Sequence, residues 1–198
     1  YMSQSGMIPV HGGELHYDDH GSGDAVVFLH AGMTNMEMWQ RQIEPFTAAG
    51  YRVVRYDLRG YGRSTSEEAD YSHHEDLLDV FSYLKIERAH LVGNSLGGRI
   101  CIDFALACPE RTRSLILVCA RPSGCPTVFP PAEVAKIEEL EAAEQGSNHD
   151  LTARLDVEVF VDGFYREGQA DAAVRDEVFR MTRANYDGQP PLTQSTPL

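Results

Sequence analysis

The segment that is most informative about the fold of this 198-residue chain is Gly93-Asn94-Ser95-Leu96-Gly97-Gly98. It has the form G-x-S-x-G and lies between an apolar run, residues 89–93, and a helical pattern, residues 95–107. In that setting the serine occupies a sharp, strained turn, and the glycines avoid side-chain collisions across it. The pattern predicts that Ser95 Oγ is exposed above the carboxyl end of a sheet, with the Leu96 N–H pointing into the same space. Ser95 is therefore the candidate nucleophile.

Apolar runs with β-branched residues recur on both sides of this stretch. Such runs are typical of strands buried on both faces of a parallel sheet, and apolar residues at helical spacing separate them. Alternating strands and helices predict right-handed βαβ units, here preceded by a hairpin. The sequence therefore predicts an α/β fold with a doubly wound, mostly parallel sheet. The expected strands are residues 7–10, 14–19, 25–30, 52–57, 89–93 and 115–119, and the expected helices are 38–46, 75–84 and 95–107.

The character of the chain changes near residue 123. Four prolines between 122 and 131 mark a junction, and polar helical patterns follow at about 132–144, 151–163 and 170–185. A Pro/Gln/Thr/Ser-rich tail from Gly188 is predicted to be mobile. We therefore assign residues 1–122 to the core of the fold and residues 123–198 to a helical cap or lid with that tail.

Composition excludes several classes of partner. The net charge is −13 and the pI is about 4.9, so the surface repels nucleic acid and anionic lipid. No apolar run approaches the roughly 20 residues of a membrane helix. The first residues show no basic or apolar leader pattern, and the four cysteines fit neither a zinc pattern nor C-x-x-C. We expect a cytoplasmic protein with free thiols that binds no metal, nucleotide or other cofactor.

The segment His30-Ala31-Gly32-Met33 follows the predicted strand 25–30. An oxyanion hole needs a second N–H, which a loop after a neighbouring strand can supply, so Gly32 or Met33 is the candidate donor. His30 lies at the strand end. Since a general base must reach the nucleophile, we interpret His30 as a residue that braces this loop by hydrogen bonding.

The segment Asp57-Leu58-Arg59-Gly60-Tyr61-Gly62 follows another predicted strand. Its glycines permit a tight loop. We interpret Asp57 and Arg59 as residues that hydrogen-bond into that loop. The alternative makes Asp57 a catalytic acid, which departs from the order Ser, acid, His usual for a nucleophile of this type.

Together these motifs resemble the α/β-hydrolase superfamily, and within it the esterase, lactonase and cofactor-free haloperoxidase-like group. The resemblance covers about residues 7–120. It implies that Ser95 is the nucleophile and that Gly32 and Leu96 supply the oxyanion N–H groups. The family's Met-Trp pair falls at Met38-Trp39, a register that favours Gly32 over Met33.

The substrate side of the site has candidates of its own. Met33 and Asn94 flank the oxyanion donors and are candidates for lining the substrate pocket. Residues from about Ser123 resemble the helical cap that the family inserts after its sixth strand, where it shapes substrate access. The expected partner is a small-molecule ester or lactone.

The family's remaining catalytic residues follow the cap: the acid comes after the seventh strand and the histidine after the eighth. No histidine of this chain follows a strand at a late position; all eight are His11, His16, His20, His30, His73, His74, His90 and His149. We interpret His73 and His74 as solvated residues or the first residues of a helix, and His149 as exposed.

We therefore expect the catalytic histidine and acid to be absent from this chain and the fold to be incomplete. A longer polypeptide, or a second chain, would supply the missing segment. Without it, the apolar strand around residues 115–119 would lie at an uncovered edge of the sheet.

The resemblance implies a serine hydrolase that acts on a carboxylic ester or lactone through an acyl-enzyme at Ser95. Hydrolytic carbon–carbon cleavage and perhydrolase chemistry remain open on the same site. The alternative is a catalytically inactive protein of the same fold that binds a small ligand or acts in signalling, because Ser95 without a base is a poor nucleophile.

Overall fold

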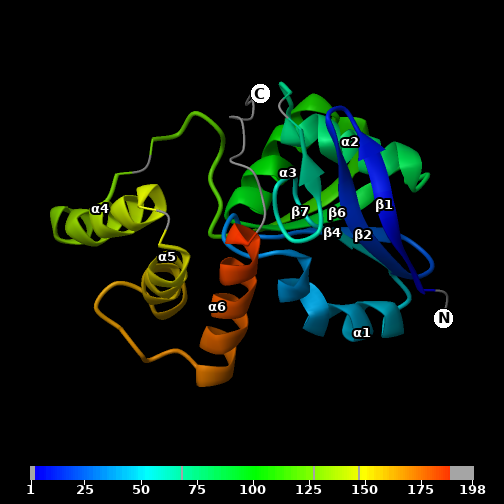
Figure 1. Cartoon of the computed structure of the whole chain (residues 1–198). Coiled ribbons are helices and arrows are strands. Elements are labelled where there is room, and N and C mark those ends of the chain that lie inside the picture. The colour runs from blue at the N-terminus through cyan, green and yellow to red at the C-terminus, as the bar shows by residue number, and fades with distance from the viewer. Residues whose placement is uncertain (1–2, 68, 127, 147, 188–198) are drawn as a thin grey trace. The chain divides into compact units, whose positions relative to one another are not determined.

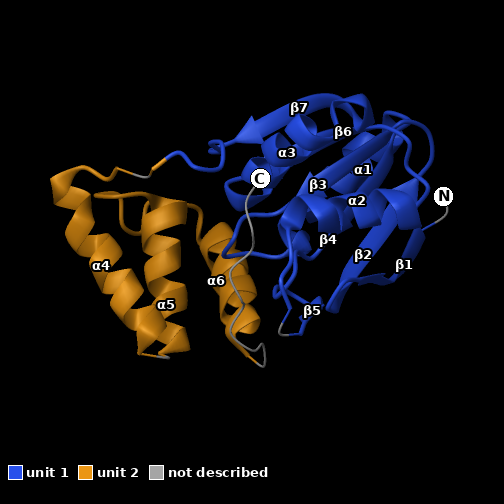
Figure 2. Cartoon of the chain, turned by 90° about the horizontal axis from the view of Figure 1, so that it is seen from above, with its two compact units in different colours: residues 1–125, 189–198 blue, residues 126–188 orange. Residues whose placement is uncertain are grey.

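The computed structural model describes residues 3–67, 69–126, 128–146 and 148–187. The chain forms two compact units that divide after Cys125, the second of them spanning residues 126–188 (Figure 2). The mobile tail predicted for residues 188–198 lies outside the described residues.

The first unit is built on a seven-stranded sheet within the described residues, with the order β1-β2-β4-β3-β6-β7 and β5 beside β2 (Figures 1 and 2). Strands β3, β4, β6 and β7 are parallel neighbours, whereas β2 is antiparallel to β1, β4 and β5. The predicted α/β class, the hairpin and the parallel strands are confirmed. The strands are β1 Ser3–Val10, β2 Gly13–Gly21, β3 Ala25–Leu29, β4 Arg52–Tyr56, β5 Thr65–Ser66, β6 Ala89–Asn94 and β7 Thr112–Val118.

Helices cover the sheet on both faces. A 3-10 turn, Met36–Trp39, leads into α1, Gln40–Ala48, and a second one, Pro109–Arg111, leads into β7. The other helices of this unit are α2, His73–Tyr83, and α3, Leu96–Ala107. The three helices expected from the periodicity are therefore present, with boundaries shifted by one or two residues.

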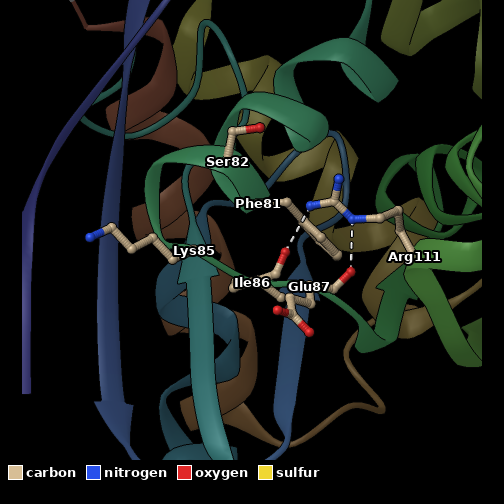
Figure 3. Close-up of a pocket in the computed structure, with 6 residues that line it drawn as sticks. All are labelled: Phe81, Ser82, Lys85, Ile86, Glu87 and Arg111. Carbon is tan, nitrogen blue, oxygen red and sulfur yellow. Dashed lines mark hydrogen bonds between the residues drawn. The ribbon is translucent and has the colours of Figure 1, made fainter.

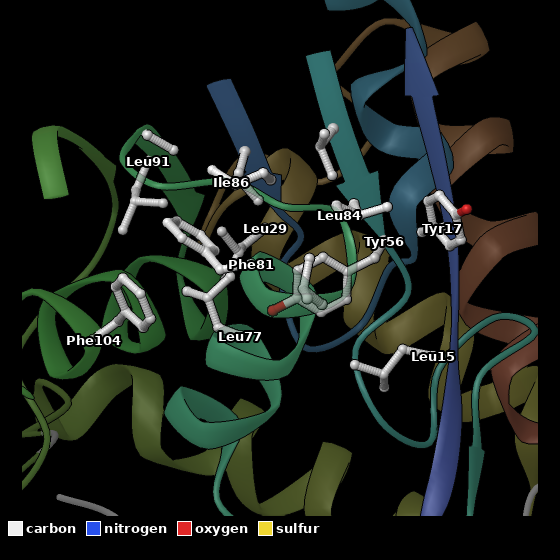
Figure 4. Close-up of a cluster of buried hydrophobic side chains, with 14 of the residues drawn as sticks. Leu15, Tyr17, Leu29, Tyr56, Leu77, Phe81, Leu84, Ile86, Leu91 and Phe104 are labelled. Carbon is white, nitrogen blue, oxygen red and sulfur yellow. The ribbon is translucent and has the colours of Figure 1, made fainter. Parts of the chain in front are cut away.

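Strand β3 shows why the sheet needs helices on both sides. All five of its residues are buried, and they alternate between two apolar clusters. Val27 and Leu29 pack with side chains of α2 and α3, where the rings of Phe81 and Phe104 lie 4.9 Å apart (Figure 4). Phe28 packs on the opposite face against Trp39, at 5.1 Å between ring centroids. Burial on both faces explains the continuous apolar run in the sequence.

The register of the parallel strands positions the candidate site. Leu29 pairs with both Tyr56 and Gly93, and Asn94 pairs with Val118. The segments that follow β4, β3, β6 and β7 therefore leave the sheet side by side at its carboxyl edge, where open α/β sheets bind their ligands.

Strand β7 is an edge strand of the sheet within the described ranges. Its apolar side chains are unusually exposed for a strand of a parallel sheet. The uncovered apolar strand expected from the sequence is thus present; its exposed fractions are Leu115 37%, Ile116 49%, Leu117 42% and Val118 39%.

The second unit is helical, as predicted. It contains α4, Pro131–Gln145, α5, His149–Asp156, a π-helical turn, Val157–Asp162, and α6, Ala172–Tyr186. The helix expected over 151–163 is therefore two elements, which end at Gly163 with φ 88°. In the described ranges, none of the chain's helices combines the length and the apolarity that crossing a membrane requires.

The expectation for His149 was wrong. It is not exposed: it begins α5, and its half-buried ring stacks on Tyr186 with 5.1 Å between centroids. Asp150 in turn pairs with Arg183 at 2.5 Å, so a second contact joins α5 to α6. The local sequence pattern around residue 149 cannot indicate a contact with Tyr186, which lies 37 residues later, and this explains the error.

Candidate active site

Ser95 lies at the turn between β6 and α3, with φ 49° and ψ −110°. A positive φ is uncommon for a residue with a side chain and marks a strained turn. The surrounding glycines allow this turn. A Cβ at Gly93 would collide with the Gly97 carbonyl, and a Cβ at Gly97 would collide with the Leu29 carbonyl at the end of β3. The strained geometry predicted from G-x-S-x-G is therefore present, and Ser95 is exposed.

Backbone hydrogen bonds fix the turn to both neighbouring strands. The N–H of Ser95 donates to the carbonyl of Val118 at 2.9 Å, and the N–H of Gly97 donates to the carbonyl of His30 at 3.1 Å. Within the described residues, neither Ser95 Oγ nor the N–H of Leu96 makes a hydrogen bond. The hydroxyl and this N–H are therefore available at the start of α3, where the helix dipole favours negative charge.

Gly32 lies beside this turn. A Cβ placed on Gly32 would be 3.4 Å from Leu96 Cδ2 and 3.5 Å from Tyr61 Oη, so the side chains of these two residues flank it. In the part of the chain that the structure describes, no hydrogen bond uses the Gly32 N–H. The second predicted oxyanion donor is thus adjacent to the first and is also available. Nothing in the sequence indicated that Tyr61 would border this loop.

The other residues of this candidate site have less defined surroundings. Met33 follows Gly32 in the same loop and is half-buried, and Asn94 ends β6 directly before Ser95 and is half-buried. Their side chains stay candidates for contact with a substrate.

His30 is fully buried, and its ring joins two loops. Its Nδ1 lies 2.7 Å from the Ala31 carbonyl, and its Nε2 accepts a hydrogen bond from the Leu58 N–H at 2.8 Å. These partners assign the proton to Nδ1 of a neutral ring. Burial of the ring lowers the pKa of His30 below its ordinary value. The hydrogen bond to Ala31 and the charge of Asp57 act to raise it but are outweighed. Because both nitrogens are engaged, the geometry supports the bracing role and leaves no lone pair for Ser95.

Asp57 also holds loops together. Its carboxylate accepts hydrogen bonds from the N–H groups of Met36 and Arg63, both at 2.9 Å, and contacts His16 Nδ1 at 3.1 Å. Burial alone would raise the pKa of Asp57, but these hydrogen bonds outweigh it and lower the pKa below its ordinary value. Asp57 therefore acts as an ionised brace, as expected.

A Ser–His–Asp chain does occur around Asp57, away from Ser95. Ser5 Oγ lies 3.4 Å from His16 Nε2, and His16 Nδ1 contacts Asp57. However, the Arg63 guanidinium lies 3.1 Å from the same Nε2 and can only donate to it. The Ser5 hydroxyl lies 3.0 Å from the carbonyl of Tyr17, to which it donates. This arrangement lacks a free base and does not compete with Ser95 as the reactive serine.

The remaining histidines have other surroundings, and no hydrogen bond joins any of the eight to Ser95 within the described residues. His73 and His74 are the first residues of α2, which was one of the two interpretations from the sequence. His73 is not solvated, however: its Nδ1 atom is buried and has no hydrogen-bond partner in the described ranges. Burial, with Arg99, Arg59 and His30 nearby, lowers the pKa of His73 to about 3. His20 pairs with Asp18, His74 with Ser72 and His90 with Ser114.

A pocket of about 460 Å³ lies elsewhere, at the amino ends of β6 and β7 (Figure 3). The side chain of Arg111 lines this pocket. The guanidinium donates to the carbonyls of Glu87 at 2.7 Å and Ile86 at 2.8 Å, and Cζ lies over the ring of Phe81, 5.5 Å from its centroid. Ser95 follows the opposite, carboxyl end of β6. This pocket is therefore separate from the candidate nucleophile.

Comparison with known proteins identifies the family of the fold. The sequence matches the family described as alpha/beta hydrolase fold over residues 24–184. A curated relative is the 2-hydroxy-6-oxononadienedioate/2-hydroxy-6-oxononatrienedioate hydrolase of Paraburkholderia xenovorans (strain LB400), which is 36% identical over 156 residues. That alignment covers 75% of this chain and 53% of the relative, so the chain spans about half the length of the curated relatives it matches.

Solved structures show the same fold. Est816, described as an N-acyl homoserine lactone degrading enzyme, is 28% identical with a TM-score of 0.66, covering 91% of this chain and 65% of its own. A structure from work on carboxylesterases of Nitrososphaera gargenis has a TM-score of 0.73 at 22% identity, covering 91% of this chain and 66% of its own. The sheet order, the strained serine turn and the match over residues 24–184 lead to one conclusion: the chain belongs to the α/β-hydrolase fold family.

Proposed function

We propose that the protein is a serine hydrolase that cleaves a small-molecule carboxylic ester or lactone through an acyl-enzyme at Ser95. One observation carries the proposal: an exposed serine with φ 49° stands at a helix N-terminus beside two backbone N–H groups, of Leu96 and Gly32, that make no hydrogen bond within the described residues. A strained serine turn with available donors next to it is what stabilisation of a tetrahedral oxyanion requires.

The reaction follows from this arrangement. Ser95 Oγ attacks the substrate carbonyl carbon and passes its proton to a general base. The carbonyl oxygen becomes an oxyanion that accepts hydrogen bonds from the N–H groups of Leu96 and Gly32. Collapse breaks the bond to the leaving alkoxide, which takes up the proton, and leaves the acyl group on Ser95. Water then attacks the acyl-enzyme with the help of the same base and releases the acid.

The base and its acid partner are proposed to come from polypeptide outside this sequence, either a further segment of the same protein or a second chain. Two observations support this. No histidine of the chain hydrogen-bonds to Ser95 in the described ranges, and both nitrogens of His30, which braces the adjacent loop, are engaged. The curated relatives are also about twice as long as the matched segment.

Two substrate classes have support from relatives. An ester or lactone is supported by the name of Est816. The compounds in the name of the Paraburkholderia relative carry a ketone and two carboxylates but no ester. Their hydrolysis therefore breaks a carbon–carbon bond next to the ketone. Attack on a ketone also forms an oxyanion, which the same N–H groups would bind, so carbon–carbon hydrolysis is the second candidate.

Turnover assays with the full-length protein test both. We expect hydrolysis of an aryl ester or an acyl homoserine lactone, with loss of at least about a thousandfold in kcat for Ser95→Ala. Hydrolysis of a 2-hydroxy-6-oxo dienoate in preference to both would replace the ester proposal by the second candidate. A folded protein that binds these compounds but turns over none would contradict both and indicate a binding protein.

A further inference from the structure

The thioether of Met38 lies against the loop that carries Gly32. The N–H of Ala31 points at Met38 Sδ at 3.4 Å, and the hydroxyl of Thr34 lies 3.1 Å from the same sulfur. These two donors lie on either side of Gly32 and Met33 in the sequence. The sulfur therefore contacts both ends of the segment whose N–H groups are the candidate oxyanion donors.

The other side of this loop is held by the Ala31 carbonyl. It accepts hydrogen bonds from His30 Nδ1 at 2.7 Å and from the N–H of Thr34 at 3.1 Å. The Thr34 hydroxyl, which has a single hydrogen, lies 3.1 Å from this carbonyl as well as from the sulfur. For the N–H of Ala31, Met38 Sδ is the acceptor that the structure shows.

The position of Met38 is itself fixed. It belongs to the 3-10 turn Met36–Trp39, which Asn35 caps through its side-chain oxygen and the N–H of Glu37 at 3.0 Å. Asp57 accepts the N–H of Met36 at 2.9 Å, and Trp39 packs on Phe28 under the sheet. A sulfur presented from such a rigid turn gives the loop one preferred position.

We propose that Met38 is a positioning residue of the oxyanion hole, in which Sδ accepts the Ala31 N–H and contacts the Thr34 hydroxyl and so directs the Gly32 N–H toward the substrate. This inference rests on the proposed function. The sulfur does not touch the substrate, and its effect reaches the reaction through the loop. Because the oxyanion forms only as the reaction proceeds, misdirection of the Gly32 N–H weakens the transition state more than substrate binding.

A merely structural role makes different predictions. Met38 is half-buried and packs against the cluster around Phe28, which a leucine of similar volume would also fill. Leucine has no acceptor, whereas glutamine has similar length and a carbonyl oxygen. Met38→Leu therefore removes the acceptor and keeps the packing, and Met38→Gln restores an acceptor. Met36→Leu is the matched control, because Met36 is buried in the same turn and, among the described residues, no hydrogen bond from the loop reaches its sulfur.

The test uses the full-length protein, an aryl ester as substrate, and thermal unfolding to verify each variant. We expect Met38→Leu to lower kcat about tenfold with KM changed by less than about twofold, which is the signature of a contact made in the transition state. Met38→Gln should regain most of that loss, and Met36→Leu should keep the kcat of the parent. Thr34→Val, which removes one donor and keeps Met38, should lower kcat about threefold.

An active parent protein with an equally active Met38→Leu variant would overturn the role of Met38 and leave the proposed function intact. So would a loss of kcat in Met38→Leu that Met38→Gln does not recover and that follows a loss of thermal stability. A parent protein that hydrolyses none of the substrates and leaves Ser95 unlabelled by a fluorophosphonate would contradict the proposed function and this inference together.

Discussion

Gly97 and His30 are joined by a hydrogen bond of 3.1 Å, from the N–H of Gly97 in the first turn of α3 to the carbonyl at the end of β3. This bond couples the helix that carries the candidate nucleophile to the loop that carries the second oxyanion donor. The two parts of the site therefore keep their spacing only while the backbone of Gly97 approaches β3 closely.

We expect Gly97→Ala to lower the free energy of unfolding by about 1–3 kcal/mol, because the new Cβ would collide with the Leu29 carbonyl and approach the His30 carbonyl to 2.7 Å. Urea unfolding followed by the fluorescence of Trp39 measures this. Gly32→Ala is the control for stability, since its Cβ would make ordinary contacts of 3.4–3.6 Å with side chains. Equal stability of the two variants would show that the close approach is absent in solution.

The first unit should lose stability in acid through His73 and His30. Both have a folded-state pKa below the ordinary value of 6.5, His73 at about 3, chiefly because burial penalises the charged ring. Their neutral forms contribute stability fully above about pH 6.5, and this contribution is lost as the pH falls from there toward the folded-state pKa.

Unfolding free energies measured between pH 7.5 and 4 test this expectation. His73→Gln, which cannot take up a proton, should show a shallower fall than the parent. His11→Gln, which changes an exposed residue of the hairpin turn, should follow the parent curve. A parent curve that is flat across this range would contradict the assignment.

The second unit should respond to pH in the opposite direction through Asp156. Burial, with Glu144 nearby, raises the pKa of Asp156 from 3.8 to about 7. A raised carboxyl pKa means that stability is greatest below about pH 4 and is lost as the pH rises toward 7. We therefore expect Asp156→Asn to stabilise this unit at pH 8, by up to about 4 kcal/mol, and the gain to vanish near pH 4.

Amide hydrogen exchange of α5 peptides measures the effect of Asp156→Asn within the second unit. Asp150→Asn is the matched control, because Asp150 lies on the same helix but is exposed and pairs with Arg183. It should give no gain at pH 8. Slower exchange in both variants, or in neither, would contradict the role of burial at Asp156.

The sequence predicted those parts of the fold that local pattern determines. Apolar runs such as Ala25–Leu29 signal strands because burial on both faces admits no polar residue. The serine turn was predictable because Gly93 and Gly97 have no room for a side chain. Strand β5 was missed, since two residues paired with β2 carry no periodic signal.

The candidate site was predictable at the backbone level and much less so at the level of side chains. The positions of Ser95, Leu96 and Gly32 follow from motif spacing, whereas the contacts of Met38 Sδ and of Tyr61 depend on loop geometry that the sequence does not encode locally. His73 was expected at a helix start or in solvent. Its burial depends on tertiary packing of α2, which no local pattern reveals.

The most direct test of the central claim is fluorophosphonate labelling of the full-length protein, read by intact mass and peptide mapping. We expect one adduct on Ser95, no adduct in Ser95→Ala, and unchanged labelling in Ser5→Ala, because Arg63 occupies the lone pair of His16 Nε2. A folded protein that remains unlabelled, or that is labelled at Ser5, would contradict the assignment of Ser95 as an activated nucleophile.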